Sequence, residues 1–195
     1  MRTLILCVGN ESILDDGIGA RIGEILQSLP LPANIQVDVV ARLRLDVLDQ
    51  LVDVDHLVIV DGLTAEAEPG TSTVVDVTGH SAAVVASGCC HSRDVADIIR
   101  LARDVAPDGA EFMITIAGVR VEHVDRYGAT FSQAVLSAVS RIVDLLLLTT
   151  GAGLQLRLFA AESLRQSDRQ SDRISREPSA FCSWREGYEL SPNFQ

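Results

Sequence analysis

Lysine is absent from this 195-residue chain, and all 16 of its basic residues are arginine. No side-chain amine is therefore available as a nucleophile or for a Schiff base, which excludes that class of covalent catalysis. The 27 acidic residues leave a net charge of −11. A chain this acidic lacks the basic footprint needed to bind nucleic acid without sequence preference or to dock on anionic membranes. We therefore expect neither nucleic acid nor a membrane as a partner.

Cysteine is scarce, with only Cys7, Cys89, Cys90 and Cys182. No spacing among the four matches a zinc knuckle, and the adjacent Cys89 and Cys90 are not expected to form a disulfide with each other. Reduced thiols are the rule in the cytosol. The N-terminus has none of the features of a signal peptide. These observations predict a cytoplasmic protein.

Long apolar runs are also missing. The longest apolar region, residues 134–148, is interrupted by Arg141 and Asp144. It is too short to span a bilayer. The length of the chain and its 47% hydrophobic content instead indicate one domain with a full core.

Short apolar runs alternate with helical patterns along residues 1–150, which predicts an α/β domain with a mostly parallel sheet covered on both faces. The tail at 151–195 differs, because it carries equal numbers of arginine and acidic residues and a tandem repeat, RQSDRQSDR, at 165–173. Such a segment buries little, so we expect it to be partly disordered. The strands are expected at residues 3–8, 35–40, 57–60, 73–77 and 112–117, and the helices at 18–29, 45–51, 93–105 and 130–148.

Several candidate ligands follow the expected strands. Asp15 and Asp16 come after the first strand, Asp61 after the third, and His91 before the helix that follows the fourth. Because ligands of open parallel sheets bind beyond the carboxyl ends of the strands, these side chains should meet at one edge. Two or three carboxylates and one imidazole suit a divalent cation. These ligand types do not distinguish among nickel, zinc, manganese and magnesium.

Each candidate also has a structural explanation. We favour Asp15 as a helix cap, and Asp16 could complement the helix dipole as well as bind a metal. Asp61 before Gly62 is a common exit from a strand, and His91 alone could be an ordinary loop histidine. Cys89 and Cys90 are expected to be buried, inert thiols.

The segment at residues 4–19, LILCVGNESILDDGIG, resembles the N-terminal signature of the hydrogenase maturation proteases. These endopeptidases trim the C-terminus of the large subunit of nickel-iron hydrogenases. Later blocks resemble the family in order, over about residues 1–148. They are HLVIVDGL at 56–63, EPGT at 68–71, the histidine at position 91 and IAGV at 116–119.

The resemblance implies a three-layer αβα sandwich, of the phosphorylase/hydrolase-like kind, around a twisted, mostly parallel sheet. It also implies a nickel site made of Asp16, Asp61 and His91, in which the nickel belongs to the substrate. The partner would be a nickel-loaded large-subunit precursor, from which a monomeric enzyme removes a C-terminal extension.

Two mechanisms remain open for such a peptidase. The cation could activate water or polarise the scissile carbonyl, or it could only position the precursor while a carboxylate, with Asp15 as the candidate, acts as general base.

The family's Asp-Gly-Gly-Thr loop is replaced here by residues 39–43, VVARL. That departure motivates an alternative, a non-catalytic module that binds nickel or the precursor. A nucleotide-binding enzyme is disfavoured, because Asp15 and Asp16 would repel a pyrophosphate.

Overall fold

The computed structural model describes residues 1–42, 45–105, 112–128 and 130–153. Apart from its first three residues, the tail predicted for 151–195 lies outside these ranges. The elements are β1 (Thr3–Val8), η1 (Leu14–Gly17), α1 (Ile18–Ser28), β2 (Ile35–Val40), η2 (Leu45–Leu51), β3 (His56–Leu63), β4 (Ser72–Asp76), α2 (Ala82–Ala86), α3 (Ser92–Val105), β5 (Met113–Arg120) and α4 (Gln133–Thr149).

The strands form one sheet in the order β2-β1-β3-β5-β4. The first four in this order run parallel, and β4 pairs antiparallel with the edge of β5. The predicted mostly parallel sheet is therefore confirmed. Its strands are continuous apolar runs because helices cover both faces.

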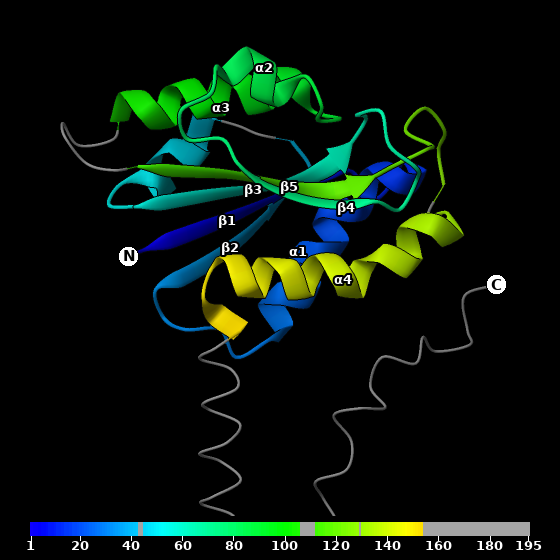
Figure 1. The fold of residues 1–195 in the computed structure, drawn as a ribbon, viewed down its shortest axis with the longest axis horizontal. Helices are drawn as coiled ribbons and strands as arrows, with labels where there is room; N and C mark the ends of the chain where they lie inside the picture. Colours follow the sequence, from blue (N-terminus) through cyan, green and yellow to red (C-terminus); the bar gives the residue numbers. More distant parts are fainter. Residues whose placement is uncertain (43–44, 106–111, 129, 154–195) are drawn as a thin grey trace, which may run out of the picture. The chain divides into compact units, whose positions relative to one another are not determined.

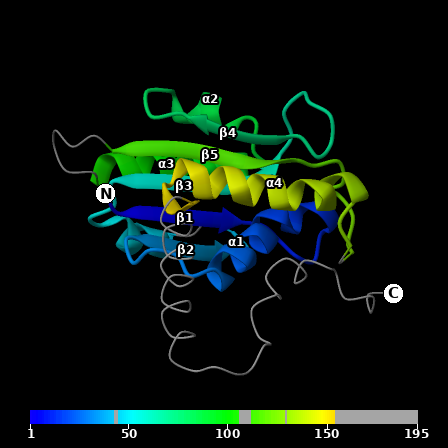
Figure 2. The ribbon, with the colours of Figure 1, turned by 60° about the horizontal axis from the view of Figure 1, so that its bottom comes forward.

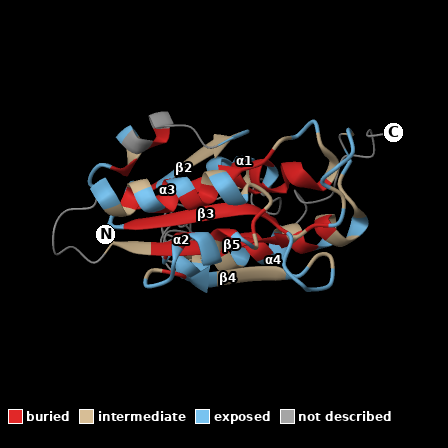
Figure 3. Ribbon diagram, turned by 90° about the horizontal axis from the view of Figure 1, so that it is seen from above, coloured by how far each residue is buried: buried red, intermediate tan, exposed pale blue. Residues whose placement is uncertain are grey.

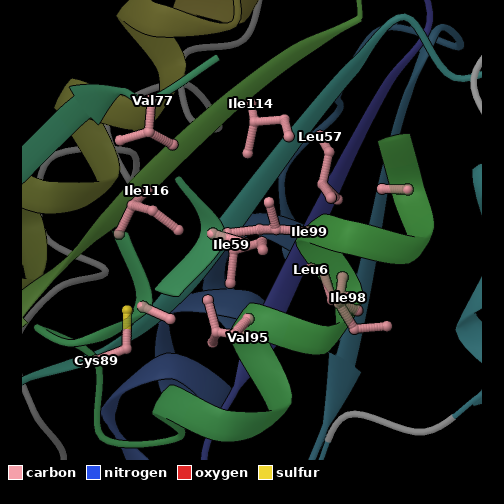
Figure 4. Close-up of a cluster of buried hydrophobic side chains, with 14 of the residues drawn as sticks. Leu6, Leu57, Ile59, Val77, Cys89, Val95, Ile98, Ile99, Ile114 and Ile116 are labelled. Atoms are coloured by element: carbon pink, nitrogen blue, oxygen red, sulfur yellow. The ribbon is translucent and has the colours of Figure 1, made fainter. Parts of the chain in front are cut away.

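The sheet lies between two helical layers (Figure 1), which confirms the three-layer αβα sandwich. Helices α2 and α3 cover one face, and α1 and α4 cover the other (Figure 2). Each layer has its own apolar core. The first contains Leu57 and Ile59 of β3 together with Val95 and Ile99 of α3 (Figure 4).

The central strand β3 is buried along its whole length (Figure 3). It runs three residues beyond its predicted end at residue 60, so Asp61 lies inside the strand and not after it. The Asp61-Gly62 pair is typical of a strand exit, but Gly118 and Val119 of β5 continue the ladder beside it. Side chains alternate along a strand, so Asp61 projects toward the same helical layer as Ile59.

Other boundaries also differ from the sequence predictions. Helix α2 was not expected, and β5 extends to Arg120 where the pattern predicted an end at residue 117. Helix α3 begins at Ser92, one residue before its predicted start, and the carbonyl of His91 accepts the Val95 N–H. None of the described helices is long and apolar enough to cross a membrane.

The start of α1 approaches the sheet very closely at Gly19. A Cβ at this position would overlap the backbone carbonyl oxygen of Val8 and would lie 2.9 Å from the carbonyl oxygen of Val60. Both atoms belong to buried strands that cannot move aside. Gly19 therefore sets the distance at which η1 and α1 meet the carboxyl edge of the sheet.

A small polar cluster lies at the opposite edge of the sheet. His56 is 2% exposed, and its Nε2 lies 2.8 Å from Oγ1 of Thr115. Its Nδ1, and Oγ1 of the paired residue Thr3, are buried without a hydrogen-bond partner. Burial lowers the pKa of His56 below its ordinary value of 6.5, and the charge of Asp76 opposes this effect. The folded protein therefore favours the neutral imidazole.

We predict that Gly19→Ala destabilises the fold by about 3 kcal/mol or more, because overpacking against rigid backbone is costly. Helix propensity alone would predict the opposite sign, a gain of about 1 kcal/mol. Gly79 is the matched control, since nothing lies within 4 Å of a Cβ there. Urea unfolding followed by far-UV circular dichroism would measure both variants. A stabilised Gly19→Ala protein would contradict the described packing.

We also predict that His56 makes folding stability depend on pH. A group with a lowered folded pKa contributes stability that is present above its unfolded pKa, here near 6.5, and is lost as the pH falls through the folded pKa. The free energy of unfolding should therefore fall on acidification more steeply in the wild type than in His56→Gln, which cannot titrate. Denaturant unfolding between about pH 8 and pH 5 would measure this difference. Parallel curves for the two proteins would contradict it.

Candidate active site

Three predicted site residues meet at the carboxyl edge of the sheet. Asp16 comes from η1, Asp61 from β3, and His91 from the position just before α3. Nε2 of His91 lies 3.6 Å from Oδ2 of Asp16, and Nδ1 of His91 lies 2.9 Å from Oδ1 of Asp61. The imidazole therefore lies between the two carboxylates.

The Asp61 carboxylate holds His91 in place. Asp61 is fully buried, and its Oδ1 accepts the Gly62 N–H at 2.8 Å in addition to facing Nδ1 of His91. Its Oδ2 accepts the backbone N–H of His91 at 2.9 Å. Asp61 thus fixes both the backbone and the ring of His91. A carboxylate at Nδ1 selects the tautomer with the proton on that atom, which leaves the Nε2 lone pair of the neutral ring directed toward Asp16.

The distance between His91 and Asp16 is informative. At 3.6 Å the pair is too far apart for a hydrogen bond. Two ligands that each lie about 2.1 Å from one tetrahedral metal ion would be about 3.4 Å apart. The two side chains therefore suit adjacent positions on one cation. Among the described residues, no three His, Cys, Asp or Glu side chains already converge as a metal-binding group. Both oxygens of Asp61 accept hydrogen bonds from the protein.

The electrostatics of the site shift two pKa values upward. The hydrogen bond to Asp61 raises the pKa of His91, and the charges of Asp61 and Asp16 add to this effect against the cost of burial. Burial is the main cause that raises the pKa of Asp16; the Asp61 charge adds to it, whereas His91 and the backbone N–H of Asn10 oppose it. A carboxylate with a raised pKa is a stronger base, and shifts of this kind are common at catalytic sites.

Asp15 does not cap the helix that follows it, so that prediction was wrong. Its buried carboxylate binds the loop before α4 instead: Oδ1 accepts the Ser132 N–H at 2.7 Å, and Oδ2 accepts the Glu122 and His123 N–H groups at 3.3 and 3.2 Å. No side-chain cap precedes η1 or α1. Asp15 joins the β1–η1 segment to a loop more than 100 residues away.

The neighbouring cysteine thiols are unreactive. Cys7, Cys89 and Cys90 are all free, and Cys182 lies outside the described residues. Burial, reinforced by the Asp61 charge, raises the pKa of Cys89 to about 12. Burial likewise raises the pKa of Cys90, with the charges of Asp61 and Asp16 adding to the effect and that of Arg120 opposing it. Thiols that remain protonated are poor nucleophiles.

One charged residue at this edge was missed in the sequence. Arg120 ends β5, opposite Leu63 at the end of β3. The only available signal was its position two residues after the glycine of the last strand, and the predicted strand stopped short of it.

The divergent loop after β2 is described only to Arg42, because residues 43–44 lie outside the described ranges.

Comparison with known proteins defines the family. The model of the hydrogenase maturation protease family matches residues 42–149, which is more than half of the chain. The chain therefore belongs to the hydrogenase maturation protease family, and it is a peptidase. The matched range contains Asp61 and His91, and Asp16 precedes it. No curated protein matches the chain.

Solved structures share the fold. The hydrogenase maturating endopeptidase HybD from E. coli is 24% identical, with a TM-score of 0.64 over 76% of this chain and 91% of that one. The [NiFe] hydrogenase maturation protease HybD from Thermococcus kodakarensis is 23% identical, with a TM-score of 0.62 over 75% and 97%. The endopeptidase HycI from Escherichia coli is 19% identical, with a TM-score of 0.59 over 74% and 88%.

We predict that Asp15→Asn loosens the loop before α4. An amide replaces one acceptor oxygen by a donor that faces backbone N–H groups, and an unsatisfied buried group costs about 1–3 kcal/mol. Amide hydrogen exchange should accelerate at Glu122, His123 and Ser132, while the amides of β1 and β3 keep their protection. Unchanged exchange at all three positions would contradict the described contacts.

Proposed function

We propose that this peptidase removes a C-terminal extension from the nickel-loaded large-subunit precursor of a nickel-iron hydrogenase. The observation that carries the proposal is the pair of unshared ligand atoms, Nε2 of His91 and Oδ2 of Asp16, which face each other at 3.6 Å at the sheet edge. The family assignment supports proteolysis, and the donor set supports a substrate that presents a metal ion. Nickel accepts both imidazole and carboxylate ligands; here it belongs to the substrate.

In this proposal Asp61 acts through His91. The family resemblance implied Asp16, Asp61 and His91 as three metal ligands. With Asp61 engaged as described, His91 and Asp16 contact the nickel of the precursor, and Asp61 orients the imidazole and strengthens it as a ligand. Within the described part of the chain, Oδ2 of Asp61 accepts only the His91 N–H, so its second lone pair is available for a third ligand bond. Recognition of the metal would place the scissile bond at the edge of the sheet and restrict cleavage to loaded precursor.

Hydrolysis also requires a base for the attacking water. We propose Asp16 for this role, because its carboxylate lies beside the metal contact His91, where one oxygen binds the cation and the other accepts the proton. Asp15, the other candidate, has both carboxylate oxygens engaged by backbone N–H groups. It serves instead as a positioning residue that holds η1. General-base catalysis of this kind contributes about 10²- to 10⁴-fold.

We further propose that the enzyme acts as a monomer in the cytoplasm. The three described cysteines are free, which fits a reducing compartment. The partner is a protein, because the net charge of −11 opposes both nucleic acid and anionic lipid.

Incubation of the enzyme with its cognate precursor, purified with and without nickel, tests the proposal. We expect intact mass spectrometry to show loss of one C-terminal peptide from the nickel-loaded precursor only. A folded enzyme that binds the loaded precursor but never cleaves it would support the alternative of a non-catalytic binding module. Equal cleavage of both precursor forms would contradict recognition through the metal.

Variants then assign the roles in the same assay. We expect Asp16→Asn and His91→Ala to lower the cleavage rate at least about 100-fold, and Asp61→Asn to lower it about 10- to 100-fold through loss of His91 orientation. Asp97→Asn is the control, because Asp97 is an exposed residue of α3 paired only with Arg100. A wild-type rate for any of the three site variants would remove that residue from the proposed machinery.

A further inference from the structure

Arg120 places a positive charge beside this acidic site. The register pairs Asp61 with Gly118 and Leu63 with Arg120. Because side chains two residues apart on a strand share a face, Arg120 projects from the same face of the sheet as Asp61, at the carboxyl end of β5. Its charge also acts on the thiol of Cys90, the residue before His91.

The guanidinium of Arg120 has no partner within the described part of the chain. No carboxylate there lies within ion-pair distance of it, although the site contains two aspartates. Its Nε is buried without an acceptor. The side chain is half-buried, so the outer nitrogens remain accessible. A buried donor without a partner costs free energy, and that cost is greater for a charged group.

We propose that Arg120 binds a carboxylate of the precursor's C-terminal extension and so helps to position the chain that is cut. This inference rests on the proposed function. An arginine fork matches a carboxylate in geometry and charge. Asp16 and Asp61 would repel a substrate carboxylate at this edge of the sheet. A positively charged side chain is therefore needed to bind it there. The carboxylate comes either from the C-terminus of the precursor or from an acidic side chain of the extension.

A binding experiment tests the contact without cleavage. The Nε–H of Arg120 is shielded from solvent, so its resonance should be visible in a ¹⁵N–¹H spectrum of the full chain and is assigned by its loss in Arg120→Lys. The titrant is a synthetic peptide of the cognate extension, used intact, with an amidated C-terminus, or with its acidic side chains replaced by amides. We expect the intact peptide to shift the resonance. The altered peptide that fails to shift it identifies the source of the carboxylate.

Cleavage kinetics test the consequence. We expect Arg120→Gln to raise the KM for the nickel-loaded precursor about 10- to 100-fold, with kcat within about twofold of the wild type because Arg120 does not touch the reacting atoms. Arg120→Lys should recover part of the loss. The control is Arg100→Gln, which removes the same charge from an exposed ion pair of α3 and should leave KM unchanged.

The outcomes separate the two proposals. Failure of the wild type to cleave loaded precursor would refute the proposed function, and the peptide titration would still decide the role of Arg120. A normal KM for Arg120→Gln would overturn the inference and leave the proposed function intact. Equal shifts of the Nε–H resonance by all three peptides, or no shift by the intact peptide, would also overturn it.

Discussion

The structure depends on the fully buried carboxylate of Asp61. A buried carboxylate without donors would be strongly destabilising. The backbone N–H groups of Gly62 and His91, together with the His91 ring, supply those donors. To do so, the end of β3 and the start of α3 must adopt one arrangement. The geometry of the site is therefore a condition of folding, and the imidazole is oriented before any substrate arrives.

This arrangement also anchors the site to the sheet. Asp61 is a member of the central strand, with β1 on one side and β5 on the other. Gly118 of β5 lies so close to the Asp61 backbone that an added Cβ would overlap its carbonyl oxygen. Sites carried by regular elements hold their geometry more accurately than sites carried by loops.

Structural features that depend on local sequence patterns could be predicted from the sequence. Parallel strands buried on both faces are continuous apolar runs, so these strands could be located from the sequence. The convergence of Asp16, Asp61 and His91 follows from their shared carboxyl edge. Longer-range contacts were not predictable. The Asp15 carboxylate binds residues 107 to 117 positions away, which no helix-cap pattern reveals. The true end of β3 depends on its pairing with β5, and the same pairing brings Arg120 to the site.

Asp15 and Asp16 are consecutive residues of η1, yet they serve different parts of the molecule. Asp15 is hydrogen-bonded to the loop before α4. In that loop the side chain of Tyr127 is 89% exposed to solvent. Asp16 faces the imidazole. The hydrogen bonds of Asp15 therefore connect this loop to the residue directly before Asp16. Two neighbouring residues of η1 thus divide their tasks: one holds a loop at the outer surface, and the next contributes to the site.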